Sequence, residues 1–104
     1  MVGGGYVGAV WVDLHLPTCT SLKEKRRQLR RLTQRLAQRH GCALAEVDHH
    51  DLWQRAGITA AVVGRDVSDV RARLEHLTRA LHADEEFVVV QERTTIASLE
   101  ELLE

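Results

Sequence analysis

The residues best suited to chemistry gather in a short acidic and histidine-rich segment near the middle of the chain. They are Glu46, Asp48, His49, His50 and Asp51, types that hold metal ions or transfer protons. Adjacent residues of a strand face opposite ways, so His49 is poorly placed to join Asp48 in one site. Asp13 and His15 belong to a different expected strand, which a third strand should separate from this segment. We therefore predict a hydrogen-bonded turn here, with a small metal-dependent enzyme as the weaker alternative.

Nucleophilic and phosphate-binding motifs are missing from the sequence. There is no G-x-S-x-G motif, and neither Cys19 nor Cys42 has an assignable base. Residues 3–5 are glycines, but they lack the spacing and the lysine of a phosphate-binding loop. Two cysteines in a chain without an export signal are expected to be reduced and unpaired. We predict no catalytic, cofactor-binding or metal-binding residue and no small-molecule substrate, so the sequence favours a non-enzymatic protein.

A basic segment is the stronger functional candidate. Residues 21–40 contain eight lysines and arginines against Glu24 alone, whereas the whole chain has a net charge of −1. The cations expected to face away from the core are Lys23, Arg27, Arg30, Arg31 and Arg35. Such a stripe can follow an RNA backbone or an acidic protein surface. The alternative is a solvated helix face neutralised by the acidic residues 84–86, and the sequence leaves both open.

The elements that would position these residues follow from hydrophobic periodicity. Apolar residues alternate along the first strand, and leucines recur at helical spacing after Ser21, which forms an S-x-x-E capping box with Glu24. Lys25 and Arg26 lie nearer this leucine stripe, and we expect them to pair with carboxylates at the edge of the sheet. The expected elements are a strand over 6–16, a helix over 21–40, strands over 42–48 and 57–64, a helix from 67 to about 81, and a strand over 87–93.

This order predicts an α+β fold of the ferredoxin-like βαββαβ type. Right-handed crossovers place both helices on one face of a four-stranded antiparallel sheet with strand order 4-1-3-2. We expect the 104 residues to form a single domain, with a core over about 6–93. Residues 94–104 would form a C-terminal tail, with a short helix opened by Ser98. No apolar run approaches the roughly 20 residues needed to cross a bilayer, so we expect a cytoplasmic protein without membrane contact.

The opposite face of this sheet is left uncovered. Val7, Ala9 and Trp11 should point to it, and Trp53 is a further candidate to anchor a loop or a partner. We expect such an exposed apolar patch to be buried, either by a second copy in a homodimer or by the C-terminal tail. A base-stacking platform is the weaker alternative, because the chain has four aromatic residues.

Three segments together resemble a known family. They are VGAVWVDLHLP, SLKEKRRQLRRL and LAEVDHHDLWQRAGITAAVVG, and they are similar to the YlxP-like family (DUF503) of small bacterial proteins of unknown function. The resemblance covers about 7–64 and extends more loosely to Arg93. It implies a ferredoxin-like fold, self-association and no established activity. Genes of this family often neighbour those for transcription, translation-initiation and ribosome-maturation factors, which implies a role around RNA or the ribosome.

The leading hypothesis is a homodimeric, non-enzymatic module that presents its basic helix to RNA, for example to a ribosomal precursor. The competing hypothesis is a structural or protein-binding dimer with no nucleic-acid role.

Overall fold

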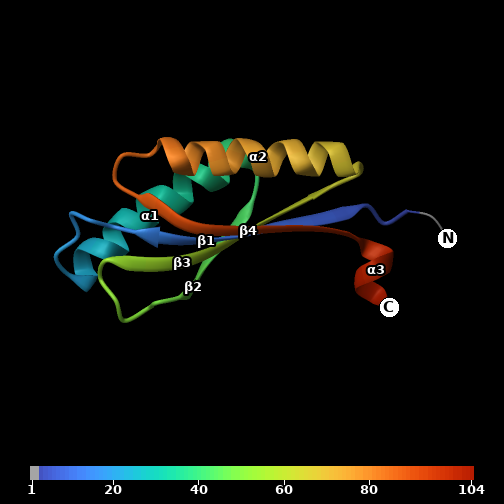
Figure 1. Ribbon diagram of the computed structural model, residues 1–104. Coiled ribbons are helices and arrows are strands. Elements are labelled where there is room, and N and C mark those ends of the chain that lie inside the picture. Colours follow the sequence, from blue (N-terminus) through green and yellow to red (C-terminus); the bar gives the residue numbers. More distant parts are fainter. Residues whose placement is uncertain (1–2) are drawn as a thin grey trace.

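Four strands and three helices follow one another along the chain in the computed structural model, which describes residues 3–104 (Figure 1). They are β1 (Tyr6–His15), α1 (Leu22–His40), β2 (Ala43–Asp48), β3 (Arg55–Gly64), α2 (Val67–Ala83), β4 (Val88–Ser98) and α3 (Leu99–Leu103).

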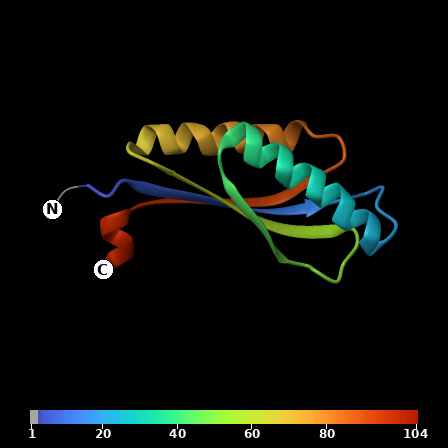
Figure 2. The same cartoon turned by 180° about the vertical axis from the view of Figure 1, so that it is seen from behind.

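The four strands form one sheet in the order β2-β3-β1-β4, with every neighbouring pair antiparallel. Helices α1 and α2 pack against one face of it, as the two opposite views show (Figures 1 and 2). The predicted α+β, ferredoxin-like fold and its strand order are therefore confirmed. We call the sheet surface opposite α1 and α2 the open face.

The core lies between the sheet and the two helices. Alternate residues of β1, Val10, Val12 and Leu14, are at most 2% exposed. They share one hydrophobic cluster with the leucines at helical spacing on α1 and α2. Burying each such side chain contributes about 1.5–3 kcal/mol. This packing fixes which side of α1 meets solvent.

The start of α1 is capped much as its sequence indicates. The Ser21 Oγ accepts a hydrogen bond from the Glu24 backbone N–H at 3.1 Å. The reciprocal bond of the capping box goes elsewhere, because the Glu24 carboxylate accepts the hydroxyl and backbone N–H of Thr20. The Thr20 hydroxyl, and then its N–H, hold the pKa of Glu24 below its usual value. Gly41, at φ 58°, ends the helix and donates its N–H to the Ala37 carbonyl.

The C-terminal region differs from the prediction. Strand β4 does not end at Arg93 but continues to Ser98, which lies opposite Tyr6 of β1. The first half of β1 needs this partner on its free edge, and residues 94–96 are β-branched. The tail therefore begins only after Ser98. The predicted short helix is confirmed as α3, and Ser98 and Glu101 form both bonds of its capping box.

None of the three helices within residues 3–104 combines the length and the hydrophobicity that crossing a bilayer requires.

Candidate functional site

Four cations lie together on the solvent side of α1. They are Lys23, Arg26, Arg27 and Arg30, which we call the basic cluster. All four are exposed, and none forms an ion pair within residues 3–104. Their spacing of three, four and seven residues places them on one side of the helix. The cluster is therefore a patch of uncompensated positive charge.

Two other predicted cations are already neutralised within the chain. The Arg31 Nη2 lies 3.2 Å from the Glu86 Oε2, and Arg35 pairs with Asp84. The alternative hypothesis predicted that the acidic residues 84–86 neutralise the basic helix face. They do so for these two arginines only. The structure divides the five predicted cations into three that are free and two that are paired.

Arg26 was not expected among the free cations. It does not pair with a carboxylate at the sheet edge as predicted, because its side chain lies at the rim of a groove between α1 and β2. The groove has a volume of about 360 Å³, and its lining includes Leu29, Leu44 and Ile58, with Arg26 and Arg30 beside them. Thr33 and Glu46 also line it, so a groove of mixed apolar and polar character adjoins the basic cluster. Helical spacing from Lys23 was the sequence signal that could have identified Arg26.

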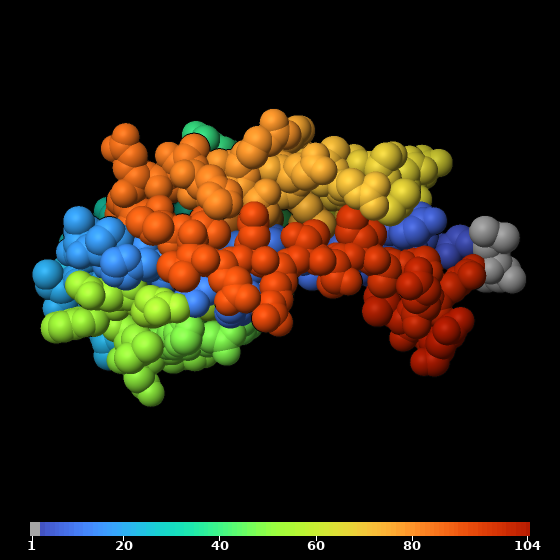
Figure 3. Space-filling model, viewed as in Figure 1, coloured from blue at the N-terminus to red at the C-terminus, as the bar shows by residue number. Residues whose placement is uncertain are grey.

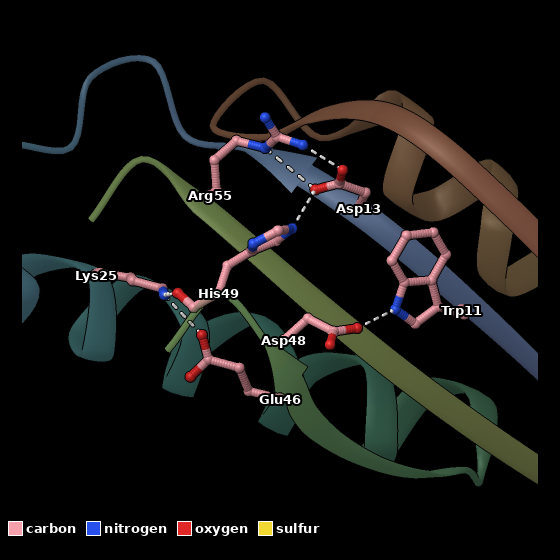
Figure 4. A network of polar contacts seen from close by, with 7 residues as sticks. All are labelled: Trp11, Asp13, Lys25, Glu46, Asp48, His49 and Arg55. Atoms are coloured by element: carbon pink, nitrogen blue, oxygen red, sulfur yellow. Dashed lines mark hydrogen bonds and ion pairs between the residues drawn. The ribbon is translucent and has the colours of Figure 1, made fainter. Parts of the chain in front are cut away.

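Lys25 is buried on the opposite side of the same helical turn, with 1% of its surface exposed. Its Nζ lies 2.7 Å from the Glu46 Oε2 on the edge strand β2 and donates to the His49 carbonyl at 2.7 Å (Figure 4). The predicted pairing of Lys25 with a sheet-edge carboxylate is confirmed. This side chain fastens α1 to β2 and to the loop that follows it.

Further polar residues meet on the open face at the same end of the sheet (Figure 4). The Asp13 side chain, 8% exposed, accepts the Arg55 guanidinium and lies 3.6 Å from the His49 Nε2. Beside this group, the Trp11 Nε1 donates to the Asp48 Oδ2 at 2.9 Å. We call these five residues, together with Lys25 and Glu46, the sheet-end network.

As predicted, β3 separates β1 from β2, yet side chains from the two sides meet across it at this point. Gly57 of β3 lies between Asp48 and Asp13 in the register. A Cβ on Gly57 would approach the Asp48 Cβ to 2.5 Å, so only glycine leaves room for that side chain above β3. A β-bulge between Glu46 and Asp48 also breaks the expected alternation and places Asp48 beside Trp11.

A family model matches residues 7–94, which contain the basic cluster and the whole sheet-end network. The chain belongs to the DUF503 family. The family's description is a protein of unknown function, so membership assigns no activity. No curated protein matches the chain.

In this DUF503 protein the sheet-end network is built like a structural clasp. His49 has a φ of 63°, a conformation that costs a non-glycine residue free energy and persists where its surroundings hold it. That backbone directs the His49 carbonyl to Lys25 and its ring to Asp13. Each of the three carboxylates has a basic or indole partner, and no group of three or more metal-binding side chains occurs among residues 3–104. The Leu52 N–H donates to the His49 carbonyl at 3.0 Å, so a hydrogen-bonded turn follows β2 as predicted.

The two cysteines of the DUF503 protein are free thiols, as predicted. Cys19 is fully buried, and its Sγ donates to the Ser21 carbonyl at 3.2 Å. Burial raises the pKa of the Cys42 thiol, which keeps it in its neutral and less nucleophilic form at neutral pH. Neither thiol has the environment of an activated nucleophile.

The remaining predicted residues of the DUF503 protein concern its open face. Val7, Ala9 and Trp11 lie on it, opposite Val63, Ala61 and Thr59 of β3. Trp53 lies outside the sheet, in the loop between β2 and β3, and is 50% exposed. Half of its surface is thus available to a partner.

Proposed function

We propose that this DUF503 protein is a non-enzymatic module that binds RNA through the basic cluster on α1. The observation that carries the proposal is the division of charge along this helix. The four cations of its first half have no carboxylate partner among the described residues, whereas Arg31 and Arg35 in the second half are paired with Glu86 and Asp84; Arg39, in the last turn, is again without an ion pair. The free cations are therefore available to an anionic partner from outside, whereas the paired ones already have one.

The dimensions of the cluster suit a phosphate backbone. Lys23 and Arg30 are seven residues apart on a helix, a distance of about 10 Å. Phosphates of one strand follow one another at about 3.4 Å along a nucleic-acid helix axis, so the cluster spans about three intervals, or about four phosphates.

The groove beside the basic cluster favours RNA, rather than any other polyanion, as the ligand. Its apolar residues Leu29, Leu44 and Ile58 offer a surface for an unstacked base, its polar residues Thr33 and Glu46 offer hydrogen-bonding groups, and Arg26 and Arg30 can stack on a base plane or hold its phosphate. Unstacked bases occur in loops and single-stranded segments of RNA. A ribosomal precursor RNA presents many of these.

The salt dependence of binding tests this proposal. We expect the full chain to bind a ribosomal RNA fragment with a slope of about −3 in a plot of log K against log salt concentration. Four phosphate contacts each release about 0.7–0.9 of a counterion, which gives this slope. Affinity should therefore drop about 60-fold between 50 and 200 mM salt. A fluorescence-anisotropy titration with labelled RNA measures both values. Absent or salt-insensitive binding would remove the RNA function and favour the competing hypothesis, a protein-binding or structural dimer.

A further inference from the structure

The open face is a shallow surface of small and apolar side chains near its middle. Cross-strand neighbours on it include Ala43, Ala61, Ala9 and Thr95, which form one row across all four strands. The next row toward α3 contains Val63, Val7 and Ala97, and Val63 is 66% exposed. Small residues let a helix approach a sheet closely, so this region is suited to receive one.

Helix α3 buries none of its side chains in the protein core. It has five residues, none of them buried, and Leu102 and Leu103 are 56% and 75% exposed. A hydrogen bond from the Leu99 N–H to the Gly5 carbonyl fixes where it begins. It lies on the opposite side of the sheet from α2, at one end of the open face (Figures 1 and 2). A helix this short needs packing partners to be stable, and its own chain gives it few.

The shape of the molecule shows where such a partner fits. The underside is recessed between α3, in red, and the green segment around the β2–β3 loop (Figure 3). The chain's own α3 forms one wall of this recess and leaves its floor uncovered.

Charge on the two surfaces is complementary. Residues 99–104 carry three glutamates and no cation. Arg93, which lies directly opposite Trp11 and so on the open face, is exposed and has no ion pair within residues 3–104. It precedes Leu99 by six residues, most of them extended strand, so about 17–20 Å of chain separates Arg93 from its own α3. The α3 glutamates of a second copy would supply the carboxylates that its own chain does not place beside Arg93.

We propose that two copies of this chain pair through their open faces about a two-fold axis, each seating its α3 in the recess of the other. Leu102 and Leu103 of one copy pack on the small-residue row of its partner, and the glutamates of α3 lie toward the partner subunit's Arg93. A ten-residue strand is about 33 Å long, so the face covers roughly 500 Å² in projection. With α3 added, this approaches the roughly 800 Å² per partner that a stable interface buries. The arrangement is independent of RNA binding, because the basic cluster lies on α1.

Sedimentation analysis of the full chain tests this pairing. We expect the wild type to be a dimer at micromolar concentration. The variant Leu102→Glu with Leu103→Glu should raise the dimer dissociation constant at least tenfold, since each buried leucine contributes about a factor of ten or more to association. Val63→Glu, which changes the floor and not the helix, should have the same effect. Circular dichroism reports whether these variants keep the fold, as we expect because the three side chains are exposed.

Val67→Glu is the matched control, because Val67 is also an exposed apolar residue but begins α2 on the other side of the sheet. It should leave the dimer unchanged. A monomeric wild type overturns the proposal, and so does a dimer that resists either the α3 or the Val63 change. A monomer whose tryptophan fluorescence responds to RNA would instead assign the open face to base stacking.

Discussion

Replacing Arg27 and Arg30 together by glutamine is expected to weaken RNA binding about 25- to 60-fold at 0.1 M salt. Each lost phosphate contact removes the release of about 0.7–0.9 of a counterion, which corresponds to a factor of about five to eight per residue at that salt concentration. Both side chains are exposed, so the fold should be unaffected. Titration with the same labelled RNA measures the loss, and the salt dependence of binding should become correspondingly shallower.

The matched control is the replacement of Arg31 and Arg35 by glutamine. This variant also removes two positive charges from α1, but these two charges are already paired with Glu86 and Asp84. We expect less than about a threefold change in affinity, because exposed charges beyond the contact are screened by salt. Equal losses in the two variants would mean that RNA responds only to net charge, which would contradict a defined site.

Replacing Lys25 by methionine should destabilise the protein by about 3 kcal/mol. Methionine keeps most of the aliphatic stem, so the packing of α1 is retained. The change leaves the Glu46 carboxylate and the His49 carbonyl without their donor, and removing one partner of a buried ion pair costs about 3–5 kcal/mol. The Glu46 side chain is 25% exposed and regains some hydration, which places the effect at the lower end. Urea denaturation should show a midpoint lowered by about 1–2 M.

Lys23 offers a control two residues away on the same helix. Lys23→Met changes the same residue type at an exposed position, and we expect a change within about 0.5 kcal/mol. Adding Glu46→Met to the Lys25→Met variant should restore much of the lost stability, because no buried charge is then left unpaired. If Lys25→Met and Lys23→Met were equally stable, the contacts of Lys25 with β2 and the following loop would contribute nothing to the free energy of unfolding.

Much of the fold was accessible from local patterns. The alternation of Val10, Val12 and Leu14 identified both β1 and its buried side, and the leucine period of α1 identified which cations face solvent. These features are local, because strand and helix periods are fixed by backbone geometry. The family resemblance agreed with the fold that these patterns predict.

The features that escaped prediction depend on cross-strand register. The sheet-end network exists because Gly57 lies between Asp48 and Asp13, and a single bulged residue turns Asp48 toward the open face. Nothing in the sequence around Asp48 marks that bulge. The length of β4 was underestimated for a similar reason, since its last five residues are held by pairing with β1.

The division of the basic stripe was also hidden in the sequence. Arg31 and Arg35 look like their neighbours until the fold brings residues 84–86, about 50 positions later, against the second half of α1. Charge counting therefore predicted the stripe, but only the three-dimensional structure separates the free cations of its first half from the paired Arg31 and Arg35.

Amide chemical shifts can show whether RNA contacts the basic cluster on α1. The full chain, labelled with ¹⁵N, is titrated with the ribosomal RNA fragment, and shift changes are followed for each residue. We expect the largest changes at residues 23–30 and small ones at 84–86. Changes centred on the open face around Ala9 and Trp11, or no changes at all, would contradict it.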